Sequence, residues 1–266
     1  MIRILLAFGL LLGASSARAD EVVLYGAGSL SAVLTKITQD FTRKTGIPVR
    51  TAFGPSGLMR EKIEKGDKVD ILASADMASP LRLREEGKVA AVAMFTRNKL
   101  CAFAAAEAGL AAANFGERLL DASVKLGTST PKADPGGDYT WAMFRLIDKA
   151  MPGAFARLDA KAQKIVGGTA AANPSDPDPI ATAFRNGQIN VMMGYCSGAE
   201  QRRKATPGIL VVQVPDAYET GPEYGLAIER TDNAAVMALV FAILSPEGQT
   251  TLGQYGFAPV GMPGQP

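Results

Sequence analysis

The chain of 266 residues contains no histidine, and it has only two cysteines and one tryptophan. Histidine is the usual general base of enzymes, the usual partner of a serine or cysteine nucleophile, and the commonest protein ligand of transition metals. Its absence disfavours hydrolases and metalloenzymes that depend on it. We therefore expect neither a histidine-dependent enzyme nor a histidine-ligated metal site.

Net charge is also nearly absent. The chain has 28 basic and 26 acidic side chains, and two of the basic ones, Arg3 and Arg18, lie in an N-terminal segment with the features of an export signal. Without that segment the charges balance. Proteins that bind nucleic acid usually concentrate Lys and Arg on one face. Nucleic acid is therefore not an expected partner.

No apolar run of the chain is long enough for a membrane helix, and the run near the N-terminus belongs to an export signal. A basic Arg3, the apolar residues 4–12 and a small-residue ending before Asp20 form the three parts of a secretory signal. We expect residues 1–19 to be a signal peptide cleaved after Ala19, and the mature protein to be periplasmic. No cysteine stands at the cleavage point, and no later segment has the ~20 apolar residues of a membrane helix. A membrane anchor is the alternative interpretation.

The rest of the chain alternates short apolar runs with amphipathic segments. In its first part, strands are expected at residues 22–25, 49–53 and 69–73, and helices at residues 30–44, 57–65 and 78–86. Further strands are expected at residues 100–104, 124–127, 191–195, 209–214 and 224–228, and further helices at 139–151, 180–185, 234–244 and 247–255. This order predicts an α/β fold with parallel strands, whose ligand site lies beyond the carboxyl ends of the strands.

Two serines stand where a glycine-containing turn leads from a strand into a helix. Ser29 lies in YGAGSLS (residues 25–31), and Ser56 lies in FGPSG (residues 53–57). Such turns present unpaired backbone N–H groups and a hydroxyl at the positive end of a helix dipole, which suits a small anion. Serine is also the ordinary N-cap residue, so helix capping is the alternative for either one.

Three runs resemble the periplasmic molybdate-binding proteins of ABC importers over essentially the whole mature chain. They are LYGAGSLSAVLTKITQDFTRKTGIPV, FGPSGLMREKIEKGDKVDILASAD and LSPEGQTTLGQYGF. The resemblance implies a two-lobed venus-flytrap with a mainly parallel sheet in each lobe and two chain crossovers, near Asn98 and Glu223. Lobe 1 would then comprise residues 20–98 and 223–266, and lobe 2 residues 99–222.

The resemblance also implies a set of ligand-binding residues. Ser29 and Ser56 match the family's donors from the first lobe. The PGGDY segment at residues 135–139 matches a helix start whose amide, from Gly136 or Gly137, meets the ligand, and Tyr195 matches a phenol donor.

One position departs from the family's pattern. The fourth donor falls on Pro177, which has no N–H, so Asp178 is its expected substitute. A carboxylate of Asp134, Asp176 or Asp178 is a further candidate contact, and the alternative is that all three are structural loop residues.

The resemblance implies capture of a tetrahedral oxyanion without catalysis and without a cofactor, with molybdate or tungstate first and sulfate or phosphate as the alternatives. A fully deprotonated oxyanion only accepts hydrogen bonds, whereas a protonated phosphate also requires an acceptor in the site. The expected partner is the membrane permease of an ABC transporter, and the expected state is a monomer.

The two cysteines allow a competing interpretation. Cys196 lies in GYCSG (residues 194–198), which has the shape of a nucleophile elbow, so a periplasmic thiol hydrolase is the alternative from another functional class. Cys101 and Cys196 both fall in the second lobe, in an oxidising compartment, which favours a disulfide. Two buried thiols are the alternative.

Overall fold

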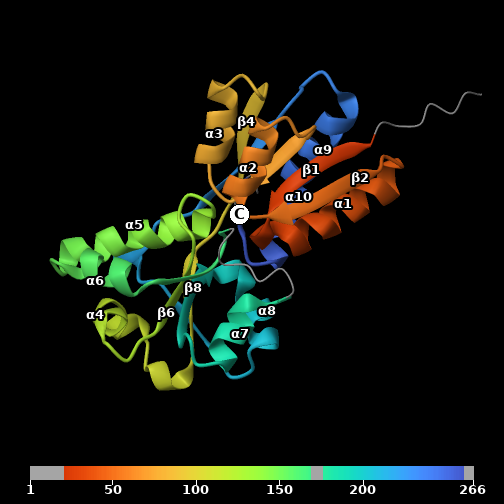
Figure 1. The fold of residues 1–266 in the computed structure, drawn as a ribbon. Helices are drawn as coiled ribbons and strands as arrows, with labels where there is room; N and C mark the ends of the chain where they lie inside the picture. The colour runs from red at the N-terminus through yellow and green to blue at the C-terminus, as the bar shows by residue number, and fades with distance from the viewer. Residues whose placement is uncertain (1–20, 169–175, 261–266) are drawn as a thin grey trace, which may run out of the picture.

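The computed structural model describes residues 21–168 and 176–260. The expected signal peptide at residues 1–19 lies outside these ranges. Two sheets dominate the molecule, each in its own lobe (Figure 1). The chain passes from the first sheet to the second between residues 97 and 100, and it returns between residues 213 and 223.

The first sheet has six strands in the order β11-β4-β10-β3-β1-β2. They are β1 (Val22–Ala27), β2 (Val49–Gly54), β3 (Ile71–Ser74), β4 (Ala91–Arg97), β10 (Glu223–Ile228) and β11 (Ala258–Pro259). β1 pairs in parallel with β2 and β3, whereas the returning β10 runs antiparallel between β3 and β4.

The second sheet has five strands in the order β7-β6-β8-β5-β9. They are β5 (Leu100–Ala104), β6 (Leu126–Ser129), β7 (Gln163–Val166), β8 (Val191–Tyr195) and β9 (Leu210–Gln213). β6 pairs in parallel with β7 and β8, and β5, the strand on which the chain enters this lobe, runs antiparallel to β8 and β9. The predicted two-lobed α/β class is confirmed.

Helices cover both faces of each sheet. Beside the first sheet lie α1 (Ser31–Thr45), α2 (Ser56–Glu64), α3 (Ala78–Glu85), α9 (Ala234–Leu244) and α10 (Pro246–Gln254). Beside the second lie α4 (Phe115–Leu120), α5 (Pro135–Ala150), α6 (Ala154–Lys161), α7 (Pro179–Arg185) and α8 (Ala199–Ala205).

The strands are apolar on both faces because each sheet separates two cores. In β3, Ile71 and Ala73 pack into the core formed with α1 and α9, whereas Leu72 packs into the core formed with α2 and α3. In β5, Phe103 lies on the face opposite to Leu100. Successive strand side chains point to opposite faces, so burial on both sides produces a continuous apolar run rather than an alternating one.

Capping residues fix where the helices near the cleft begin. α5 begins four residues before the predicted position 139, because the Asp134 carboxylate accepts a hydrogen bond from the Gly136 amide and Pro135 occupies the first turn. Asp178 caps α7 in the same way, through the amide of Ala181. Both aspartates therefore have a structural role at a helix start.

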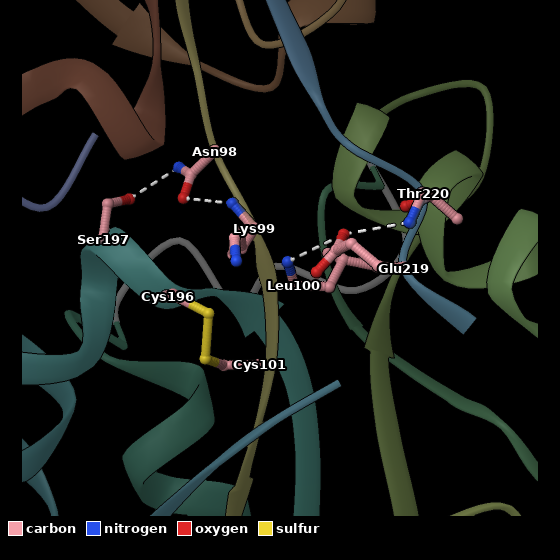
Figure 2. Close-up of a disulfide and its surroundings, with 8 residues drawn as sticks. All are labelled: Asn98, Lys99, Leu100, Cys101, Cys196, Ser197, Glu219 and Thr220. Carbon is pink, nitrogen blue, oxygen red and sulfur yellow. Dashed lines mark hydrogen bonds between the residues drawn. A yellow bond between two sulfur atoms is a disulfide. The ribbon is translucent and has the colours of Figure 1, made fainter. Parts of the chain in front are cut away.

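A disulfide joins Cys101 of β5 to Cys196, which directly follows β8 (Figure 2). The predicted bridge is confirmed. Because these are the only two cysteines of the chain, neither sulfur is present as a free thiol in this structure. The interpretation of Cys196 as a nucleophile loses its reactive group.

Among the described residues, no single helix is long and apolar enough to cross a membrane, and only α9 and α10 together, which meet at a bend of 55°, have the required length and composition.

Removing the disulfide should lower stability without altering the fold. The bridge spans a sequence separation of 95 residues, and closing a loop of that length contributes about 4.7 kcal/mol in the chain-entropy account. We expect the Cys101→Ala/Cys196→Ala variant to unfold at lower urea concentration than the oxidised protein. The reduced native protein is the matched control and should unfold with the variant. Equal midpoints for the oxidised protein and the variant would contradict the prediction.

Candidate functional site

A cavity of about 420 Å³ lies between the two lobes. On the first lobe it is lined by the turns that follow β1 and β2 and by Ala75 after β3. On the second lobe it is lined by residues of β8, by the start of α5 and by α8. The position agrees with the expectation that ligands bind beyond the carboxyl ends of parallel strands.

A second cavity, about 820 Å³ and more open, lies between α2, α3 and the loop at residues 130–133. Its wall is charged, but two of its basic side chains are already paired, because Arg60 and Arg82 both contact Glu64. The smaller cavity is lined by four of the six predicted site residues, Ser29, Ser56, Gly136 and Tyr195, and is the candidate functional site.

Ser56 lies at the start of α2, is only 1% exposed and lines the candidate cavity. Its Oγ accepts a hydrogen bond of 3.0 Å from the amide of Ala75. A hydroxyl can accept and donate at once, and the Ser56 O–H donates to no described residue. This proton is therefore available to a ligand in the cavity.

Ser29 lies in the short helix η1 (Gly28–Leu30) after β1 and also lines the cavity. Its Oγ lies 3.1 Å from Oη of Tyr224, a fully buried residue of β10. Asn98 donates from Nδ2 both to this phenol, at 3.2 Å, and to Ser197 Oγ, at 2.8 Å. Ser29 is thus connected to Tyr224 on β10 and, through it, to Asn98 between β4 and β5, the two places where the chain crosses between the lobes. Figure 2 shows Asn98 facing Ser197 beside the disulfide.

The backbone amides of the two glycines at the start of α5 already donate hydrogen bonds within the protein, whereas the resemblance implies that one of them binds the ligand. Gly136 lines the cavity, but its amide donates to Asp134 Oδ1 at 2.9 Å. The Gly137 amide donates to the Asp134 carbonyl, also at 2.9 Å, and Gly137 is not among the residues that line the cavity. Both amides are therefore occupied by Asp134 in this arrangement.

Tyr195 ends β8 and brings a phenol to the cavity. Its Oη is buried and makes no hydrogen bond of normal geometry within the part of the chain that the structure describes, although the phenol of Tyr224 interacts with it. Burial raises the pKa of this hydroxyl well above its ordinary value, so the proton stays on the oxygen at neutral pH. A buried donor without an acceptor costs about 1–3 kcal/mol, and an acceptor in the cavity would remove that cost.

The aspartates differ in position. Asp134 lines the cavity, and burial raises the pKa of its carboxyl. Asp178 is outside the lining, because its carboxylate caps α7 and contacts Nη1 of Arg202, with both oxygens at 2.9 Å. Asp176 is also outside the lining and accepts from the Asp178 amide.

Arg202 is a cavity residue that the sequence reasoning missed. It lies on α8 and is 9% exposed. The run Arg202-Arg203-Lys204 is typical of a solvated helix face, and nothing in the sequence separates the first of these residues from the others.

No group of three His, Cys, Asp or Glu residues in the described ranges could hold a metal ion.

Comparison with known proteins identifies the family. The family of bacterial extracellular solute-binding proteins matches residues 22–258. The chain belongs to this family. The cavity between the two lobes, with hydrogen-bond donors that have no acceptor among the described residues, agrees with membership of a solute-binding family.

Two of the relatives that are similar in sequence differ in how much of the chain they match. PM1146 of Pasteurella multocida, an uncharacterized protein, is 33% identical over 239 residues, which is 89% of this chain and 98% of that protein. The molybdate-binding protein ModA of Azotobacter vinelandii is 34% identical over 94 residues, which is 35% of this chain and 37% of that protein.

Solved structures share the fold of this solute-binding protein at low identity. The periplasmic molybdate-binding protein of Azotobacter vinelandii superposes with a TM-score of 0.70 at 18% identity, covering 90% of this chain and 99% of that one. PEB3 of Campylobacter jejuni, in a structure with bound L-phospholactate, gives a TM-score of 0.71 at 14% identity and covers 90% of this chain and 100% of that one.

The two lobes are in direct contact at Gly57 of the first lobe and Ala133 of the second. The Gly57 amide donates to the Ala133 carbonyl at 3.1 Å, and a Cβ atom at position 57 would lie 2.4 Å from the carbonyl oxygen of Lys132. We expect Gly57→Ala to prevent this approach of the lobes, at an overpacking cost of about 1–3 kcal/mol. Ligand affinity should fall about tenfold to a hundredfold, and the radius of gyration in solution should increase.

Gly253→Ala on α10 is the matched control, because a Cβ there would meet only Pro259 Cγ, at 3.5 Å. X-ray scattering and titration calorimetry measure the two effects. An unchanged radius and affinity in Gly57→Ala would show that the contact between the lobes does not limit closure.

Proposed function

We propose that the protein is the periplasmic solute-binding component of an ABC importer and that it captures a tetrahedral oxyanion group between its lobes. The observation that carries the proposal is the phenol of Tyr195, a cavity-lining residue whose buried Oη has no hydrogen-bond partner among the described residues. The O–H of Ser56, which has no acceptor among the described residues, supports it from the opposite lobe. Such donors replace the water shell of an oxyanion.

Among inorganic ions, molybdate and tungstate are the first candidates. Both are fully deprotonated at neutral pH, so they accept from Ser29, Ser56 and Tyr195 and require no acceptor in return. The partial sequence similarity to ModA points in the same direction.

Phosphate is the second candidate, because Asp134 lines the cavity. A protonated phosphate donates a hydrogen bond, and this carboxylate offers the acceptor that such a ligand needs. An ionised Asp134 would in turn repel a dianion. Sulfate meets the same donors as molybdate and differs mainly in size.

The proposed role is capture and delivery without catalysis. Ligand binding closes the two lobes about the crossing strands, and the closed form docks as a monomer on a membrane permease. Titration calorimetry with molybdate, tungstate, sulfate and phosphate tests the ligand. Absence of binding to all four would contradict an inorganic oxyanion as the solute.

Tyr195→Phe tests the observation on which the proposal depends. The variant keeps the ring contacts with Tyr139 and Tyr224 and deletes the donor. We expect affinity for the best oxyanion to fall about ten- to hundredfold, corresponding to roughly 1.5–3 kcal/mol. The melting temperature without ligand should change little, because no hydrogen bond to a described residue is lost.

Tyr255→Phe is the matched control, since Tyr255 is 38% exposed and does not line the cavity. It should bind like the native protein. Native affinity in Tyr195→Phe, measured by the same calorimetry, would mean that the phenol does not contact the ligand.

A further inference from the structure

The candidate cavity extends beyond the two serines and Tyr195. Its volume of about 420 Å³ lies within the range of roughly 300–1,000 Å³ that is typical of sites for small organic ligands. Apolar side chains of the second lobe form part of its wall: Phe103, Val166, Ile180, Met192 and Met193. An inorganic oxyanion has no group that would pack on this apolar surface.

Arg202 adds a cation to the same wall. The side chain is about nine-tenths buried, and both of its hydrogen bonds run from Nη1 to Asp178. Nε and Nη2 donate to no residue in the described ranges. A guanidinium carries five N–H donors in a rigid fork, so the three N–H groups on Nε and Nη2 of Arg202 have no acceptor among the described residues.

The contact with Asp178 fixes this guanidinium. Asp178 is itself held at the start of α7 by the Ala181 amide, so the ion pair joins α7 to α8. A guanidinium held in this way is preorganised to bind a second group with two acceptor oxygens, and carboxylate and phosphate have that geometry. Asp134 is the other charged side chain in the lining, and it can accept from a ligand hydroxyl.

We propose that the cavity has a second anion subsite at Arg202 and that the natural ligand is a small organic phosphate with a carboxylate. The phosphate contacts Ser29, Ser56 and Tyr195, the carboxylate contacts Arg202, and the carbon chain packs on the apolar wall. This inference depends on the proposed capture of an oxyanion and specifies its substrate class.

A matched pair of ligands tests the subsite. 3-Phosphoglycerate and glycerol 3-phosphate carry the same phosphate, and they differ in having a carboxylate or a hydroxymethyl group. We expect the full mature protein to bind 3-phosphoglycerate at least tenfold more tightly in titration calorimetry, and to bind inorganic phosphate more weakly than either ester.

Variants assign the preference to one side chain. Arg202→Met should abolish the preference for 3-phosphoglycerate, so that the two esters bind with equal affinity. Arg202→Lys keeps the charge beside Asp178, so it provides a folded variant with a reduced preference if the methionine variant is unstable. Arg203→Met is the control, because Arg203 is exposed on the same helix and does not line the cavity.

The outcomes separate this inference from the proposed function. A carboxylate preference that Arg202→Met loses and Arg203→Met keeps supports the subsite. Equal binding of the two esters, binding of molybdate alone, or a preference that persists in Arg202→Met overturns the subsite and leaves oxyanion capture intact. Failure to bind any inorganic oxyanion or phosphate ester overturns the proposed function itself.

Discussion

Buried hydrogen-bond donors that have no acceptor within the described chain are the constraint on which the site depends. The strands of both lobes direct their carboxyl ends toward one cavity, and the turns that follow place the Tyr195 phenol and the Ser56 hydroxyl there. Leaving such groups unpaired away from water costs free energy. A ligand that supplies acceptor oxygens to both lobes removes this cost only when the lobes are together, so binding and closure are linked.

The crossing strands connect the site to the rest of the molecule. Ser29, Tyr224, Asn98 and Ser197 form a continuous hydrogen-bonded series from the cavity to the residue that follows the disulfide. The Cys196 amide also bonds to the carbonyl of Lys99, which lies on the crossing itself. The disulfide thus anchors the end of β8, which delivers Tyr195, to the strand on which the chain enters the second lobe.

Much of the fold is readable from the sequence because strongly patterned segments are specified locally. The bounds of β5, β8 and α9 agree with the sequence prediction at both ends. β4 (AVAMFTR) was missed; it is held as a strand by pairing with β10 and β11, which lie more than 120 residues later in the chain. Of the candidate site, Ser29, Ser56, Gly136 and Tyr195 reach the cavity. The sequence could not predict that Arg202 lines the cavity and Asp178 does not. That arrangement depends on an ion pair between these two residues, which are 24 positions apart.

The most direct test of the central claim is a crystal of the protein grown with tungstate and measured at the tungsten absorption edge. The account predicts one strong anomalous peak in the cavity between the lobes. The oxygens around that peak should lie within about 3.2 Å of Tyr195 Oη and Ser56 Oγ. A peak at another place, or an empty cavity under conditions where tungstate binds in solution, would contradict the account.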